Sequence, residues 1–174
     1  FLNNLGSEPF DAFWLLITKQ FNWILFFLLL AYILFKKVNQ KQFLCAIVFI
    51  ALMITFSDQT INLIKNNVQR LRPCNDEELR GLIRIVKDSD TFSYFSGHAA
   101  NSTAAMMFIF LILRKHYKYT YLLFLFPLIF AYSRIYLGLH FPLDIISGYV
   151  FGSLVGLLFY VIYHTITTKY ATNS

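Results

Sequence analysis

Long hydrophobic runs separated by short polar segments are the dominant pattern of this chain. The five main runs are Trp23–Phe35, Phe43 to about Ile64, His98–Leu113, Tyr119 to about Tyr132 and Leu143 to about Tyr163. Their lengths are close to what a helix needs to cross about 30 Å of hydrocarbon, and a bilayer accepts apolar side chains on the outside of a helix bundle. The pattern predicts an all-α, polytopic transmembrane bundle of five to six helices.

The first apolar region has two interpretations. Polar residues at positions 18–20 and 22 interrupt an otherwise apolar stretch. Either one long tilted helix runs from about Asp11 to Phe35, or a short interfacial helix carrying Trp14 precedes a shorter span. The second interpretation adds a sixth element to the five spans.

Composition supports a membrane protein. Of the 174 residues, 57% are hydrophobic and only 14% are charged, which is too apolar for an ordinary soluble domain. The length favours a single membrane-embedded domain covering residues 1–174. The formal net charge of +6 favours contact with anionic lipid surfaces. We find no nucleic-acid-binding signature, and we expect no cleavable signal peptide because the first apolar run lacks a basic leader.

The basic residues of two short connections predict the orientation. Both connections lack acidic residues, and they carry Lys36, Lys37, Lys41, Arg114, Lys115 and Lys118. Under the positive-inside rule these connections face the cytoplasm, so the second and fourth connections face outward. The long second connection, from about Asn66 to Tyr94, is expected to form a lid or a headgroup-selecting surface.

Three groups of polar residues lie at the edges of the apolar runs. They are Lys65-x6-Arg72-Pro73, Ser96-Gly97-His98 and Ser133-Arg134-x5-His140-x3-Asp144. With five spans, the end of span 2, the start of span 3, the end of span 4 and the start of span 5 necessarily meet at one membrane face. The topology therefore predicts that the three groups form a single pocket at that face.

The residue types in this pocket suit the binding of phosphate. Lys65, Arg72 and Arg134 supply fixed positive charge, and an arginine can hold two phosphate oxygens at once. Ser96 and Gly97 precede span 3, so their backbone N–H groups are expected to bind an anion at a helix N-terminus. Gly97 also allows a close approach of the backbone.

Two histidines are expected to carry the chemistry. His140 is the expected nucleophile, because Asp144 lies four residues later and can accept the proton of one ring nitrogen while the other attacks phosphorus. His98 is then the general acid for the leaving oxygen, and afterwards the base that activates water.

The three groups resemble the signature of the type 2 phosphatidic acid phosphatase family, which reads Lys-x6-Arg-Pro, Pro-Ser-Gly-His and Ser-Arg-x5-His-x3-Asp. The chain departs from it at Phe95, which replaces the proline and affects the loop but removes no catalytic group. The resemblance implies a metal-independent lipid phosphatase that works through a phosphohistidine, needs no cofactor and uses the residues in the roles given above. The small size suits a bacterial inner-membrane enzyme, with the active site facing the periplasm or exterior.

The expected substrate is a phosphorylated amphiphile whose tail stays in the bilayer. The family contains phosphatases for undecaprenyl diphosphate, phosphatidylglycerol phosphate, phosphatidic acid and lipid A phosphates such as the 1-phosphate, and the sequence leaves this choice open. Two other classes are considered. A metal-dependent hydrolase would use His98, His140 and Asp144 as ligands, although three cations nearby disfavour a divalent ion. A non-enzymatic protein would bind or transport anionic lipids.

Further polar residues on the spans are candidates for supporting roles. Asp58, Asn62 and Lys65 recur at helical spacing on span 2, and His98 and Asn101 do so on span 3. An acidic residue within a span is costly and usually functional. Asp58 is expected to pair with Lys65 or with a residue of span 5, or to hydrogen-bond a neighbouring helix.

Small residues form a stripe on span 5. Gly148, Gly152 and Gly156 are four residues apart and lie on one face of the helix. We expect this face to pack closely inside the bundle, because glycines allow two helix backbones to approach. Homodimerisation through the same face is the weaker alternative, because nothing else in the sequence indicates it.

Overall fold

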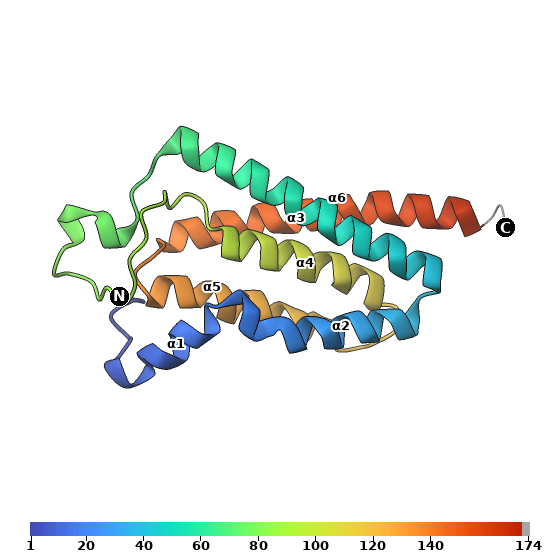
Figure 1. Ribbon diagram of the computed structural model, residues 1–174, viewed down its shortest axis with the longest axis horizontal. Coiled ribbons are helices and arrows are strands. Elements are labelled where there is room, and N and C mark those ends of the chain that lie inside the picture. Colours follow the sequence, from blue (N-terminus) through green and yellow to red (C-terminus); the bar gives the residue numbers. More distant parts are fainter. Residues whose placement is uncertain (172–174) are drawn as a thin grey trace.

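The computed structural model describes residues 1–171 and is built from helices (Figure 1). The six α-helices are α1 (Asp11–Ile17), α2 (Ile24–Lys37), α3 (Gln40–Val68), α4 (Gly97–Leu113), α5 (Leu125–Tyr136) and α6 (Pro142–Ala171). Short 3-10 helices are η1 (Glu8–Phe10), η2 (Gln20–Trp23), η3 (Pro73–Asn75), η4 (Glu77–Leu79) and η5 (Thr120–Phe124). Residues 1–171 contain no strand, in agreement with the predicted all-α class.

The N-terminal region contains two helices rather than one. Helix α1 ends at Ile17, and the extended backbone of Lys19 (φ −80°, ψ 116°) separates it from η2 and α2. The Trp23 indole N–H donates to the Ile17 carbonyl oxygen over 2.8 Å and fixes this corner. The expectation of one tilted helix from Asp11 to Phe35 is therefore wrong, because a short helix carrying Trp14 precedes the first span.

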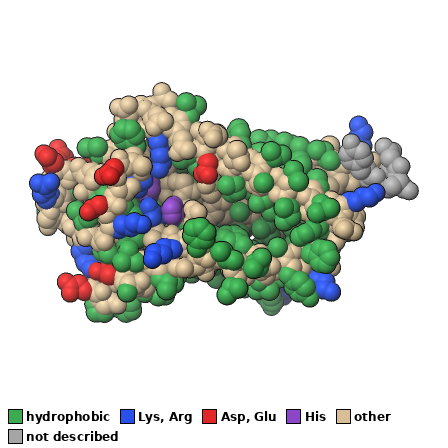
Figure 2. Space-filling view, in the orientation of Figure 1, with side chains coloured by type: hydrophobic (Ala, Val, Ile, Leu, Met, Phe, Trp, Pro, Cys, Tyr) green, Lys and Arg blue, Asp and Glu red, His purple; other side chains and the backbone are tan. Residues whose placement is uncertain are grey.

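Five helical segments match the five predicted spans. Three are long and apolar enough to cross a membrane, namely Gln20–Lys37, Gln40–Leu79 and Pro142–Lys169, and the shorter apolar segments are Gly97–Leu113 and Thr120–Tyr136. Hydrophobic side chains cover the middle of the molecule, whereas most charged side chains gather towards its two ends (Figure 2). Such a surface suits a bilayer and not water, so the chain is an integral membrane protein.

Helix α4 is the centre of the bundle. Twelve of its 17 residues are buried, and the Phe108 side chain is fully enclosed. Helix α6 packs along α4 through Gly148, Gly152 and Gly156, and a Cβ atom added at Gly152 would lie only 2.3 Å from the Ala100 carbonyl oxygen. The predicted close packing of the glycine face inside the bundle is thus confirmed.

The connection between α3 and α4 folds over the end of the bundle that holds the motif groups (Figure 1). Gln69, in a left-handed conformation (φ 50°), ends α3 and begins this loop. The N-terminal segment braces it, because the Asn3 side chain donates to the carbonyl oxygens of Arg84 and Tyr136, each over 2.9 Å. Arg84 also pairs with Asp11 at 3.0 Å. The hydrogen bond from Tyr136, aided by Arg84, holds the pKa of Asp11 below its usual value.

Candidate active site

The three motif groups meet at one end of the bundle, where the ends of α3 and α5 face the starts of α4 and α6 (Figure 1). Hydrogen bonds join them directly. The Ser96 N–H donates to the Asp144 carbonyl oxygen over 3.1 Å, and the Arg72 guanidinium donates to the Leu139 carbonyl oxygen over 2.9 Å. At this end Figure 2 shows histidine in a hollow flanked by lysine and arginine side chains. Residues far apart in the sequence therefore share one pocket.

His140 is held at both ring nitrogens. Its Nδ1 lies 3.2 Å from Asp144 Oδ2, and its Nε2 lies 3.1 Å from an Arg72 nitrogen. Because the carboxylate only accepts and the guanidinium only donates, Nδ1 carries the proton and Nε2 presents a lone pair. Asp144 is fully buried, and its Oδ2 also accepts the Phe141 N–H over 2.9 Å. The arrangement fixes both the orientation and the tautomer of the imidazole.

The Arg72 side chain is buried and held by several hydrogen bonds, as is the His140 ring that it contacts. Only 4% of its surface is exposed. Its Nε donates to the Thr91 carbonyl oxygen and its Nη2 to the Thr91 hydroxyl, each over 2.7 Å. Since the third nitrogen reaches His140 and the Leu139 carbonyl, the guanidinium is positioned before any ligand binds.

The surroundings of His140 keep its ring neutral. Burial lowers the pKa of His140 to about 3, and the positive charges of Arg72, Arg134 and Lys65 act in the same direction, whereas the hydrogen bond to Asp144 opposes them. A neutral imidazole with its proton on Nδ1 has an unprotonated Nε2, whose lone pair accepts the Arg72 hydrogen bond in this structure. The site therefore holds a potential nucleophile in its reactive protonation state.

Arg134 retains an unused donor in the pocket. Its side chain is 7% exposed, and one terminal nitrogen donates to the Thr18 hydroxyl over 2.8 Å. Its Nε is buried without a hydrogen-bond partner among residues 1–171. A buried guanidinium N–H without a partner is costly, so an anion that accepts this bond would be favoured.

Ser96 and Gly97 form the N-terminus of α4. The Ser96 hydroxyl caps the helix by accepting the Ala99 N–H over 3.4 Å. Because the Ser96 N–H donates to Asp144, the expectation that it is free for an anion is wrong. A Cβ added at Gly97 would meet only Ile61, at an ordinary distance of 3.9 Å. No neighbour in the described structure therefore requires glycine at this position.

His98 and Lys65 complete the group of predicted residues. The His98 ring stacks on Phe130 with centroids 4.8 Å apart, and Arg134, His140 and Lys65 lie within its electrostatic range. Lys65 is half-buried in the last turn of α3 and forms no ion pair within the part of the chain that the structure describes. Its ammonium group is therefore available to a ligand.

Sequence reasoning missed three contributors to the site. Arg70 pairs with Asp144 Oδ1 at 3.0 Å while its guanidinium lies over the Phe141 ring at 4.0 Å. Thr91 holds Arg72, and Thr18 holds Arg134. Arg70 could have been suspected from its place within the Lys65–Arg72 spacing, and Thr18 from its interruption of an apolar run. Nothing in the sequence around Thr91 indicates its contact.

The three candidate supporting residues have different outcomes. Asn101 of α4 donates to Asp58 Oδ1 over 2.6 Å, so Asp58 hydrogen-bonds a neighbouring helix and forms no ion pair within residues 1–171. Asn62 is exposed, and no side-chain hydrogen bond involves it in the described region. The structure therefore brings Asp58 and Asn101 together and leaves Asn62 apart.

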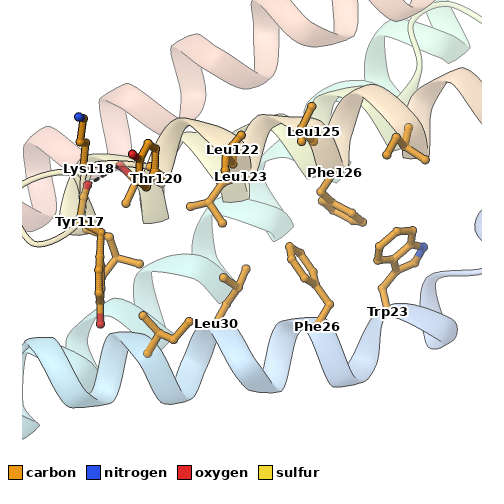
Figure 3. Close-up of a pocket in the computed structure, with 14 residues that line it drawn as sticks. Trp23, Phe26, Leu30, Tyr117, Lys118, Thr120, Leu122, Leu123, Leu125 and Phe126 are labelled. Carbon is orange, nitrogen blue, oxygen red and sulfur yellow. Dashed lines mark hydrogen bonds between the residues drawn. The ribbon is translucent and has the colours of Figure 1, made fainter.

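Two further features lie outside this group. Within residues 1–171 no three His, Cys, Asp or Glu side chains cluster as a metal-binding set. A crevice of about 590 Å³ lies between α2 and the η5–α5 segment, where Trp23 and Phe26 face Phe126 (Figure 3). Its lining is mostly apolar and includes none of the motif residues.

Known proteins resemble the chain in sequence. The model of the PAP2 superfamily matches residues 43–168, which is more than half of the chain. A lipid A 4'-phosphatase of Bacteroides thetaiotaomicron is 36% identical over 173 residues, covering 97% of this chain and 76% of the relative. A lipid A 4'-phosphatase of Porphyromonas gingivalis is 28% identical over 165 residues, covering 93% and 70%.

Solved structures share the fold. The transmembrane PAP2-type phosphatidylglycerolphosphate phosphatase of Bacillus subtilis aligns with a TM-score of 0.67 at 20% identity, covering 97% of this chain and 81% of that one. LpxE of Aquifex aeolicus aligns with a TM-score of 0.61 at 24% identity, covering 91% and 89%. The family match and the arrangement of helices agree with the geometry of the pocket. The chain therefore belongs to the PAP2 superfamily and is a membrane lipid phosphatase.

Proposed function

We propose that this phosphatase removes the 4'-phosphate of lipid A through a phosphohistidine on His140, without a metal ion. The observation that carries the mechanism is the His140 ring, held between Asp144 at Nδ1 and Arg72 at Nε2. The names of the two curated relatives support the 4'-phosphate, whereas the sequence alone suggested the 1-phosphate as one of several lipid targets.

The first step transfers the phosphoryl group to the enzyme. A phosphate in the pocket accepts hydrogen bonds from Arg134 Nε, Lys65 and the Ser96 hydroxyl. It also accepts the Arg72 N–H that points at His140 Nε2 in the free site, which releases the Nε2 lone pair. Nε2 then attacks phosphorus, a P–N bond forms, and the P–O bond to the lipid breaks. Arginine and lysine charges stabilise the oxygens of the transferring group.

His98 supplies and recovers the proton. The negative charge of the bound phosphate among these cations favours the protonated form of His98, which donates its proton to the leaving lipid oxygen. Water then attacks the phosphohistidine, gives its proton to His98, and inorganic phosphate leaves as the P–N bond breaks. Throughout both steps Asp144 stabilises the charge that develops on His140.

The histidine mechanism is tested by substitution. Purified His140→Ala should lose at least about 1000-fold in kcat, while His116→Ala, an exposed histidine between α4 and η5, should keep wild-type activity. With lipid A carrying radioactive phosphate, His98→Ala should accumulate acid-labile phosphoprotein, and the double variant with His140→Ala should not. Turnover by His140→Ala at the wild-type rate would refute the assignment.

Substrate and metal dependence are tested on one panel. Phosphate release is measured with lipid A, undecaprenyl diphosphate, phosphatidylglycerol phosphate and phosphatidic acid, and kcat/KM should be highest for lipid A with loss of its 4'-phosphate. Activity should survive a chelator. Loss of activity that a divalent ion restores would instead favour the metal-dependent alternative, and binding without turnover on every lipid would favour a transport or binding protein.

We further propose that the pocket faces the periplasm or exterior of a bacterial inner membrane. The basic connections at residues 36–41 and 114–118 support this orientation. In intact cells a membrane-impermeant thiol reagent should label Lys87→Cys in the α3–α4 loop and should spare Lys115→Cys, in a background without the native cysteines. The opposite labelling pattern would reverse the orientation.

A further inference from the structure

A second cavity lies beside His98 and is polar at one end. It has a volume of about 240 Å³ and lies among η2, α2, α3, α4 and α5. Phe130, which stacks on the His98 ring, forms part of its wall. Most of the lining is apolar, but Gln20, Asp58, Asn101 and Ser102 also line it. The cavity is therefore adjacent to the catalytic residues but chemically different from the cationic phosphate pocket.

A chain of hydrogen bonds orients the polar end of this cavity. The fully buried Ser57 hydroxyl donates to Asn101 Oδ1 over 2.6 Å, and Asn101 Nδ2 donates to Asp58 Oδ1 over 2.6 Å. The reverse orientation of the amide would set its oxygen against the carboxylate, so the order of donors is fixed. This series of hydrogen bonds ends at the Asp58 carboxylate, which only accepts hydrogen bonds.

Asp58 has unused acceptor capacity. An ionised carboxylate offers about four acceptor positions, and Asn101 occupies one of them. Asp58 is an exposed residue of the spanning helix α3 and forms no ion pair among residues 1–171, although its charge interacts with that of Lys65. A carboxylate within a membrane-spanning helix is costly and usually functional. A ligand that fills the remaining acceptor positions of Asp58 would carry hydrogen-bond donors.

The position along the helices sets where such a donor lies in a substrate. Asn101 follows His98 by three residues, or about 4.5 Å along α4, and Asp58 precedes Lys65 by seven residues, or about 10 Å along α3. With its phosphate at His98 and Lys65, a lipid would place groups about 5–10 Å from phosphorus beside this carboxylate. A sugar-based lipid has hydroxyl and amide N–H groups at that distance, whereas phosphatidic acid has none.

We propose that Asp58, oriented by Asn101, is a specificity site that binds hydroxyl or amide N–H groups of the phosphorylated lipid next to its phosphate. The proposal rests on the proposed lipid phosphatase function and names the class of substrate that the enzyme prefers. Asp58 is not a catalytic residue in this scheme, because it contacts the part of the lipid that does not react. Its loss should therefore affect some lipids and spare others.

The test compares two lipids in mixed micelles. Asp58→Ala should lower kcat/KM for lipid A about tenfold or more, mainly through KM, and should leave kcat/KM for phosphatidic acid within about twofold of wild type. Asn101→Ala should show the same selectivity. Gln59→Ala is the matched control, because Gln59 is the exposed neighbour of Asp58 on α3, and it should change neither lipid.

The outcomes separate this proposal from the proposed function. Equal losses on both lipids at an unchanged melting temperature, or no loss on either, would overturn the specificity site. If wild type releases no phosphate from lipid A, the lipid A assignment fails. Phosphatidylglycerol phosphate, which has one free glycerol hydroxyl beside its terminal phosphate, is then compared with phosphatidic acid instead. Selective loss on that lipid supports the site, and its absence overturns it. Asp58→Asn, which keeps the shape of the side chain, replaces Asp58→Ala if the latter does not fold.

Discussion

The contact between α4 and α6 predicts that one methyl group far from the chemistry will slow the reaction. A Cβ atom added at Gly152 would lie 2.3 Å from the Ala100 carbonyl oxygen and 3.0 Å from Thr103 Cβ, whereas ordinary contacts begin at 3.4 Å. Both obstacles belong to α4 itself, so no flexible side chain can move aside. In Gly152→Ala the two helices must separate by roughly 1 Å, and such overpacking costs about 1–3 kcal/mol of unfolding free energy.

That separation reaches the active site because the same two helices carry it. Gly152 is about two turns from Asp144, whose carbonyl oxygen accepts the Ser96 N–H over 3.1 Å. A shift of roughly 1 Å breaks this bond and moves His98, at the start of α4, away from His140. A misplacement of this size in a catalytic pair costs up to about 100-fold in rate.

The assay measures kcat/KM for phosphate release in detergent together with the melting temperature. Gly156→Ala is the informative partner, because its Cβ would lie 2.6 Å from Ala104 O but more than three turns from Asp144. It should destabilise the protein similarly and slow the reaction less. Ser153→Ala, half-buried on the same helix, is the control and should change neither value. Wild-type activity and stability in Gly152→Ala would refute the reasoning.

The remaining predictions concern the active site and the N-terminal segment that holds the α3–α4 loop in place. Arg70→Ala should lower kcat about tenfold, because it frees the Asp144 carboxylate that orients His140. Arg80→Ala, in the same loop, should leave kcat unchanged. Equal kcat values for the two variants would contradict a positioning role for Arg70. Because burial lowers the pKa of His140, Nε2 stays unprotonated as the pH falls through 6.5, and the acid limb of kcat/KM should lie below about pH 6. A limb at the ordinary histidine pKa would be evidence against this. Asn3→Ala removes the partner of several buried backbone groups and should lower the unfolding free energy by about 1–3 kcal/mol, as measured by thermal denaturation, while exposed Asn4→Ala should have a smaller effect.

The sequence could predict those features that depend on each segment's own composition. An apolar run of sufficient length is stable as a helix in lipid whatever its neighbours are, so the five spans followed from hydropathy. Their number then brought the ends that carry Lys65, His98, His140 and Asp144 to one face, because successive spans alternate in direction. The glycine stripe of α6 also predicted close packing correctly, because a helix face without side chains lets any neighbouring helix approach closely.

Only the tertiary structure decided which partners these residues have. Arg70 and Asp144 are 74 residues apart and Thr18 and Arg134 are 116 apart, and no local pattern specifies a hydrogen bond over such separations. The structure likewise assigned the Ser96 N–H to a carbonyl oxygen rather than to phosphate. The spans are predictable because the contact of an apolar helix with lipid depends only on its own sequence and has no preferred direction. The hydrogen bonds are not predictable in this way, because each depends on how several helices are placed relative to one another.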